Sequence, residues 1–223
     1  MAIRHKKVYA SLDTGRVDDW NDDHREDFDV ELLSSWTFAS TNLSDDFLVD
    51  VTGTADVDVA MVDNHNFCIL ATGATANSVG VLQLGDDDVT NKLDLSILTA
   101  ALQLESSDLE EFGFFTEANT PFTANQKGAY FRVVAGELYA VTGDGVDETE
   151  TDIGPISEYA QYKIEFTSTQ VRFYQDDLDV ILATHTTNIP SDDITIKFSI
   201  KNQTASNRIM RVDALALRRL RKQ

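Results

Sequence analysis

The chain has little cysteine, few basic residues and no long apolar run, and each shortage excludes a class of protein. Cys68 is the only cysteine, so no disulfide can form within the chain. Its neighbours Phe67 and Ile69 predict a small buried side chain rather than a reactive thiol. No stretch approaches the roughly 18 apolar residues of a membrane span, and the polar run from Ser11 to Asp29 lacks the apolar core of a signal peptide. We therefore expect neither membrane insertion nor a secretory leader.

Basic residues are scarce, since 18 Lys and Arg stand against 38 Asp and Glu and give a net charge of -20. Between Glu26 and Gln126, Lys92 is the only Lys or Arg. Nucleic-acid phosphates are bound by clustered bases, so we expect no nucleic-acid partner. The carboxylates repel one another at low salt, whereas molar salt shortens the screening length to about 3 Å. The composition favours a salt-adapted setting, with an acidic mesophilic surface protein as the alternative.

Catalytic patterns are also missing. The chain has no Gly-x-Ser-x-Gly motif and no Gly-rich phosphate loop. Asp56 and Asp58 have the spacing of a carboxylate pair on one strand face, but they alternate with valines and therefore read as the solvent face of a strand. Glu110, Glu111 and Glu117 flank phenylalanines without forming a compact acid pair. We expect no enzyme.

The histidines lack the spacing of zinc ligands, and we expect each of them in a loop or on the surface. They are His5, His24, His65 and His185.

What the sequence does contain is apolar residues at period two, the pattern of strands with one buried face. The clearest run covers 47–61, with a bend at Gly53-Thr54, and a second covers 93–104, where a phase change near Ile97 predicts a β-bulge. Further strands are expected at 112–115, 130–134, 138–141, 162–166, 171–174, 180–184, 194–200 and 210–217. Ala135-Gly136-Glu137 predicts a tight hairpin. Only Glu26 to Trp36 has an ambiguous helical period.

Many short antiparallel strands without helices indicate a sandwich or a barrel, and 223 residues suit one sandwich. The fold class we predict is all-β, an antiparallel jelly-roll β-sandwich with an irregular N-terminal arm. The arm is expected over 1–27, where apolar residues have no regular period, and the sandwich over 28–223.

Two resemblances extend this prediction. His5-Lys6-Lys7 followed by Asp19-Trp20-Asn21 and His24 resembles a short leader of tailed-phage structural proteins, although Val17-Asp18 stands where that leader has Pro-Ser. The resemblance implies a virion protein.

About 190 residues resemble the concanavalin A-like lectin and laminin-G-like superfamily in layout. Asp27-Phe28-Asp29 with Trp36-Thr37-Phe38 is similar to the first strand of that family. Tyr162–Phe166 and Val171–Asp177 are similar to its hairpin, with Asp177-Leu178 in place of Asp-Gly. Met210–Leu217 is similar to its last strand, which returns beside the first.

Basic residues gather at the two ends of the chain, where they either dock on an acidic neighbour or form solvated tails. Together with the leader they give the expected virion-docking residues Arg4, Lys6, Lys7, Trp20, Asn21, His24, Arg218, Arg219 and Arg221.

Acid-rich loops can bind a divalent cation, because calcium takes six to eight oxygen ligands. Lectins of the resembling family often hold calcium near the sugar, so Ca²⁺ or Mg²⁺ is a candidate cofactor. The candidate ligands are Asp86, Asp87, Asp88, Asp176, Asp177, Asp192 and Asp193. Sugar binding would use aromatic platforms, for which Trp36, Phe122, Tyr159, Tyr162 and Tyr174 are available.

Three functions are carried forward. The first is a structural protein located on the virion of a halophilic tailed virus, as a capsid decoration, vertex turret or tail appendage. Its partners would be other virion proteins, copies of itself in a symmetric homo-oligomer, and possible host surface glycans. The second is a dedicated host-attachment lectin, and the remote third is a glycan hydrolase.

Overall fold

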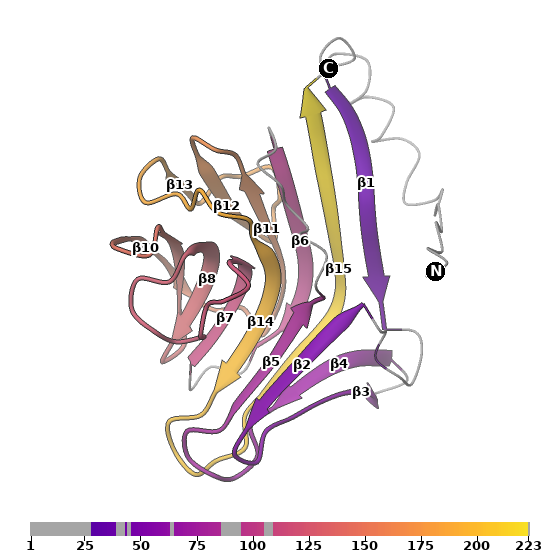
Figure 1. Ribbon diagram of the computed structural model, residues 1–223. Coiled ribbons are helices and arrows are strands. Elements are labelled where there is room, and N and C mark those ends of the chain that lie inside the picture. Colours follow the sequence, from indigo (N-terminus) through magenta and orange to yellow (C-terminus); the bar gives the residue numbers. More distant parts are fainter. Residues whose placement is uncertain are drawn as a thin grey trace.

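The computed structural model describes residues 28–38, 43, 46–62, 65–85, 95–104 and 109–222. These residues form two antiparallel sheets packed face to face, as Figure 1 shows, and contain no helix. No helix long and apolar enough for a membrane span therefore occurs in the described ranges. The predicted all-β sandwich is confirmed.

Sheet A has eight strands, with β1 and β4 sharing one edge of the long strand β15. Its path is β13 (Ala183–His185), β12 (Val171–Gln175), β11 (Tyr159–Phe166), β6 (Leu95–Gln103), β15 (Ile209–Lys222), β4 (His65–Ala71) and β3 (Asp56–Val62), with β1 (Phe28–Thr37) beside β15.

Sheet B has seven strands. Its order is β10 (Glu148–Pro155), β9 (Glu137–Gly143), β8 (Gly128–Val134), β7 (Leu109–Phe115), β14 (Thr195–Lys201), β5 (Val79–Leu84) and β2 (Phe47–Thr52).

The core lies between the sheets and is built around aromatic rings. Phe112 of β7 stacks on Phe131 of β8 at a centroid distance of 5.2 Å, and Tyr162 of sheet A meets Phe112 edge-on at 4.9 Å. Phe173 of β12 packs edge-on against Phe131 at 5.3 Å. Each fully buried side chain of this kind contributes about 1.5–3 kcal/mol through apolar burial. The ring contacts between Tyr162 and Phe112 and between Phe173 and Phe131 therefore hold the two sheets together.

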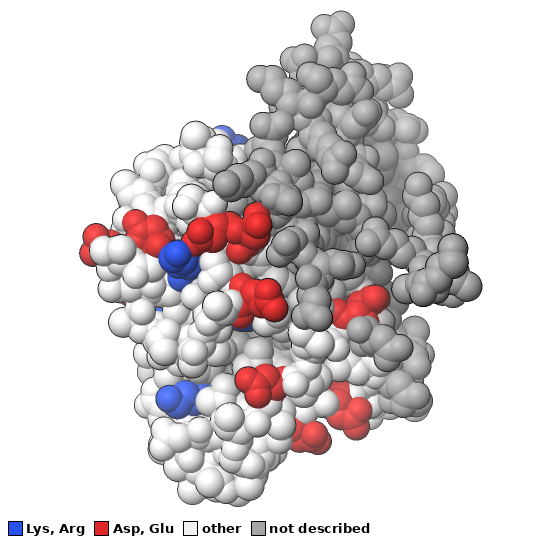
Figure 2. All heavy atoms as spheres, viewed as in Figure 1, with Lys and Arg blue, Asp and Glu red and all other residues white. Residues whose placement is uncertain are grey.

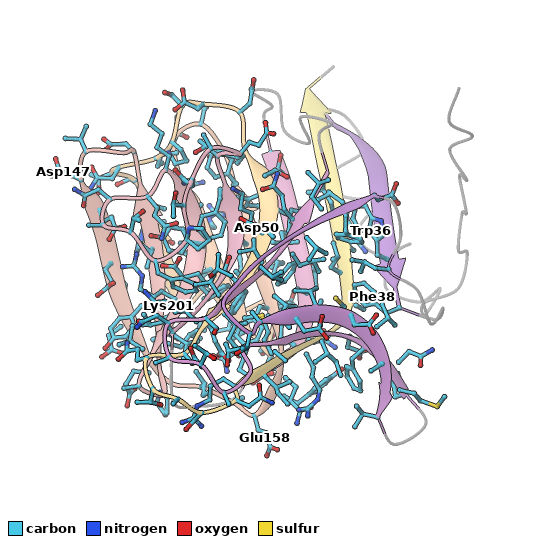
Figure 3. The ribbon with its side chains drawn as sticks, turned by 60° about the horizontal axis from the view of Figure 1, so that its bottom comes forward. Trp36, Phe38, Asp50, Asp147, Glu158 and Lys201 are labelled. Atoms are coloured by element: carbon cyan, nitrogen blue, oxygen red, sulfur yellow. The ribbon has the colours of Figure 1, made fainter. Side chains whose placement is uncertain are left out.

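The end of β1 joins this core to β2. Trp36 meets Phe47 edge-on at 5.6 Å, and its indole N–H donates to Asp46 at 3.2 Å. Phe38, which is buried, lies 6.0 Å from the Phe47 ring. Figure 3 shows Trp36 and Phe38 together at this end of the ribbon. The segment that was ambiguous in sequence is therefore a strand, and its two aromatic residues anchor it.

Most predicted strands occur, and three details differ. The expected strand at 180–184 reduces to β13, because Val180, Ile181 and Leu182 are exposed and precede it. The bulge predicted near Ile97 is not in β6, which pairs with β11 without a shift; the shift lies on β15 between Val212 and Ala214. Strands β4, β5 and β10 were not predicted as strands.

The β8–β9 hairpin confirms the predicted tight turn. Val134 pairs with Glu137, so the loop is Ala135-Gly136, with φ of +51° and +87°. Two consecutive positive φ values are those of a type I′ turn, whose twist matches that of the flanking strands.

The last strand returns beside the first, as the resemblance implied. β15 pairs with β1 from Ala214↔Thr37 to Lys222↔Phe28. Arg218, Arg219 and Arg221 therefore belong to the long strand β15, and their docking role stays a prediction. The other predicted docking residues, in 1–27, lie outside the described residues.

Candidate functional sites on the two sheet faces

The outer face of sheet B carries a buried carboxylate, Glu111 of β7. Phe112 and Phe114 face sheet A, so Glu111 faces the opposite way. Its side chain is 1% exposed. Glu111 accepts hydrogen bonds from the amide of Phe122 at 2.9 Å, the carboxamide of Gln126 at 2.7 Å and Nε of Arg132 at 2.9 Å.

Arg132 of β8 links this carboxylate to two others. Its Nη1 lies 3.1 Å from Glu148 and 3.3 Å from Glu150, both on β10. Its Nη2 donates to the Tyr130 hydroxyl at 2.7 Å, which in turn donates to Glu148 at 2.9 Å. The Arg132 side chain is 16% exposed. Arg132 thus forms ion pairs with three glutamates and donates a hydrogen bond to one tyrosine.

Burial and charge act in opposite directions on the pKa values here. Burial raises the pKa of Glu111 more than Gln126 and Arg132 lower it. Burial alone would raise the pKa of Glu148, but its bonds to Arg132 and Tyr130 lower it. Burial would lower the pKa of Arg132, and the two carboxylates reverse this into an increase. The cluster is charge-compensated, and Glu111 is the carboxylate that is hardest to ionise.

The connection between β7 and β8, residues 116–127, covers this face, and we call it the strap. Lys197 of β14, which is 3% exposed, donates through Nζ to the carbonyl oxygens of Glu117 at 2.5 Å and Asn119 at 3.2 Å. Burial lowers the pKa of Lys197. The strap is also bonded to Glu111 through Phe122 and Gln126, so buried charges fix it against the sheet.

A second cluster lies on sheet A and is open. The hydroxyl of Tyr159, at the start of β11, donates to Asp213 of β15 at 2.5 Å. Nε2 of His65, at the start of β4, lies 2.6 Å from the other oxygen of Asp213. Tyr159 is 51% exposed and the His65 side chain 58%. Burial, with the Asp213 hydrogen bond and charge, raises the pKa of Tyr159 to about 12. Asp213 occupies the β15 bulge, which re-aims its side chain.

His185 corrects the prediction that every histidine lies in a loop or on the surface. It is buried between the sheets, with Nδ1 3.0 Å from the Thr142 hydroxyl and Nε2 3.0 Å from the Thr151 hydroxyl. Its ring lies 5.3 Å from Phe173. Burial lowers its pKa. The histidine lacks a nearby carboxylate in these contacts and acts as a polar part of the core.

The candidate metal ligands are dispersed. Asp176, with φ of +58°, follows β12; its amide donates to the Gln161 carbonyl at 2.7 Å, and its carboxylate accepts from the Gln161 amide at 3.4 Å. Asp177 accepts from the amide of Asp179, and Asp192 pairs with Lys127 at 2.5 Å. Across the described ranges, no three His, Cys, Asp or Glu side chains gather as a metal site. Three of the candidate ligands, Asp86, Asp87 and Asp88, lie outside those ranges. The metal site therefore stays a prediction. Asp193 follows Asp192 in the chain.

Among the predicted sugar platforms, the structure leaves Tyr159 exposed and buries Tyr162 and Tyr174. Trp36 and Phe122 are partly buried.

Asp56 and Asp58 are exposed, in agreement with their expected place on the solvent face of a strand. Figure 2 shows that acidic side chains outnumber basic ones on the face it presents, as the net charge requires.

Cys68 is fully buried, as predicted. Burial, with the nearby Asp58 carboxylate, raises the pKa of its thiol to about 12. A thiol with that pKa is a poor nucleophile at neutral pH.

No protein-family model and no curated protein matches the sequence. Solved structures do resemble the fold. The carbohydrate recognition domain of Emp47p has a TM-score of 0.58 at 12% identity, covering 82% of this chain and 93% of that one. The VIP36 exoplasmic/lumenal domain, in its Ca²⁺/Man3GlcNAc-bound form, gives 0.55 at 9%, covering 77% and 83%.

A putative beta-glucanase from Mycobacterium abscessus gives a TM-score of 0.59 at 10% identity, covering 84% of this chain and all of that chain. At these identities the likeness shows the fold alone. The sandwich matches concanavalin A-like lectin folds.

Proposed function

We propose, taking the concanavalin A-like sandwich as the premise, that this chain is a non-enzymatic virion surface protein whose sandwich contacts host glycans. Two similar structures support the glycan-binding part of the proposal. The Emp47p domain is a carbohydrate recognition domain, and the VIP36 domain was solved with Man3GlcNAc bound. The phage-like leader and the basic residues near the chain ends motivate the virion part. The virus would infect a salt-adapted host, and the chain would assemble as a symmetric homo-oligomer.

The observation that carries the non-enzymatic proposal is the Glu111–Arg132 pair beneath the strap. Glycoside hydrolysis by two carboxylates needs both of them beside the sugar. Here Glu111 is covered by the strap and bonded to three donors, and Glu148 is held by Arg132 and Tyr130. These carboxylates are committed to holding the strap on the sheet.

Two measurements test the proposal. Purified particles should contain the protein at a fixed copy number, and its absence from them would remove the virion role. The purified chain, assayed on a glycan array in molar KCl, should retain a defined set of glycans. If no glycan on the array binds the protein, only the structural role in the virion would remain.

A hydrolase is the second candidate, because the pKa of buried Glu111 is raised, as in a general acid. The fold of the putative beta-glucanase is also similar. Incubation with β-glucans should release no reducing sugar. Turnover that disappears in Glu111→Gln would reverse the assignment.

A further inference from the structure

We propose that glycans bind on the outer face of sheet A, where the ring of Tyr159 stacks on a neutral pyranose and Asp213 accepts its hydroxyls. The inference rests on the proposed glycan-binding function and gives it a place and a ligand class. It puts the site on the opposite side of the sandwich from the strap-covered face of sheet B.

Strand order determines how the Tyr159 ring lies. Tyr159 is on β11 and its hydroxyl partner Asp213 is on β15, and β6 runs between those two strands. Two strand spacings amount to about 10 Å, whereas strand side chains ordinarily stand upright from the sheet. The tyrosine must therefore lie across β6 to reach the carboxylate. Its 51% exposure agrees with one ring face on the sheet and one in solvent.

The hydrogen bond at 2.5 Å holds that ring in place before any ligand arrives. An aromatic side chain has few torsions to lose, and a tethered one loses still less on binding. The open face of a tyrosine suits the patch of C–H groups on a pyranose, which is the apolar side of an otherwise polar molecule.

Polar side chains lie on the same face of the sheet as the ring. A carboxylate has about four acceptor positions, and Tyr159 and His65 each take one at Asp213. The carboxamide residue Gln103 is the register partner of Tyr159, and exposed Gln161 follows two positions along the same face of β11. A stacked ring with several planar polar groups around it is the arrangement expected of a small polar ligand site.

Charge selects the class of sugar. The chain carries a net charge of -20, and Asp213 adds a carboxylate at the centre of the cluster. Uronic acids, sialic acids and sulfated sugars would be repelled at low and moderate salt. Neutral hexoses avoid that repulsion while still donating hydroxyls to Asp213. We therefore expect neutral glycans to be retained and anionic ones to be excluded.

The test is a glycan array at about 0.15 M KCl, where anionic glycans should be excluded, and in molar KCl, followed by calorimetry in molar KCl with the full chain and three variants. Tyr159→Ala should weaken binding of the best neutral glycan by about tenfold or more, and Tyr159→Phe, which keeps the ring but loses the tether, by less. Tyr139→Ala is the matched control, because Tyr139 is a partly buried aromatic on the outer face of sheet B. It should bind like the wild type.

The outcomes separate the two proposals. Wild-type protein that binds no neutral glycan overturns both. If the Tyr159→Ala variant still binds the glycan as tightly as the wild type, only the placement on sheet A is overturned. The same holds if Tyr139→Ala loses binding while Tyr159→Ala retains it. Retention of a host glycoprotein after its glycans have been removed would replace the sugar by a polypeptide partner. Thermal melting of each variant at the same salt checks that lost binding is not lost folding.

Discussion

Arg132 is the residue on which the charge balance of sheet B depends. Replacing it with Met would leave Glu111 buried without its cation, and such a change costs about 3–5 kcal/mol. We expect Arg132→Met to lower the free energy of unfolding by that amount in a denaturant titration at constant salt.

The matched control is Glu150→Gln, which alters the most exposed carboxylate around the same guanidinium, at 42% exposure. It should change stability by less than about 1 kcal/mol. The double variant Glu111→Gln with Arg132→Met should recover part of the loss, because the fully buried Glu111 charge is removed, whereas Glu148 still loses its bonds to Arg132. An Arg132→Met protein as stable as the wild type would contradict the ion-pair account.

His185 gives the protein a pH dependence on the acidic side. Burial holds its folded-state pKa below the value of about 6.5 in the unfolded chain, so the unfolded state binds more protons as the pH falls. The contribution of neutral His185 is complete above about pH 6.5 and is lost progressively below it. The melting temperature should fall from pH 7 to pH 5, and His185→Gln should flatten that fall. An unchanged profile in the variant would assign the effect to other groups.

Single residues were predictable where the local pattern was sufficient. The apolar neighbours of Cys68 indicated its burial, and the valines around Asp56 and Asp58 indicated their exposure. His185 was misplaced because its sequence neighbours Thr184 and Thr186 are polar and exposed, whereas the groups that hold its ring in the core are hydroxyls of Thr142 and Thr151, which are far away in the sequence. The cluster of Tyr159, His65 and Asp213 could not be predicted from the sequence, because the order of the strands in sheet A brings these distant residues together.

At the scale of elements, the first part of the strap is held by one buried side chain, Lys197. Lys197→Met keeps the length of the side chain and removes its bonds to the Glu117 and Asn119 carbonyls. Two hydrogen bonds from a charged donor, at about 1.5–3 kcal/mol each, stabilise the strap by roughly 3–6 kcal/mol. Hydrogen exchange over 116–127 should become faster, while the core strands change little.

Lys127→Met is the control for that experiment, because Lys127 pairs with Asp192 on the surface and such pairs contribute about 1 kcal/mol or less. Strap exchange in Lys197→Met that matches Lys127→Met would show that Lys197 does not hold the strap.

Strands were predictable where one face is apolar and the other polar. The run that became β2 and β3, with its bend at Gly53-Thr54, is the clearest example. β10 was missed because its residues alternate between Glu and Thr and show no apolar face, and β5 because its apolar residues are nearly continuous. The bulge predicted in β6 does not occur, because Leu95 and Ile97 are half-buried on the face opposite to Leu98, so the apolar residues change face without an extra residue.

At the scale of the whole molecule, the net charge of -20 predicts stabilisation by salt. Raising KCl from 0.1 M to 1 M shortens the screening length from about 10 Å to about 3 Å and weakens repulsion between the carboxylates. A gain of about 2 kcal/mol would raise the melting temperature by roughly 4–8 °C for a chain of this size. Sucrose at equal osmolality is the control for solute exclusion. Equal gains in sucrose would contradict screening.

The pairing of β1 with β15 has a mechanical consequence. Phe28 and Lys222 are register partners, so the two outer ends of this strand pair emerge side by side, as Figure 1 shows. A force that pulled these two ends apart would load one pair of backbone hydrogen bonds at a time, from Lys222 towards Ala214. Because β15 is also paired with β6 from Arg211 to Leu220, β15 would stay attached to the sandwich while β1 separated from it, until Thr37 had been released.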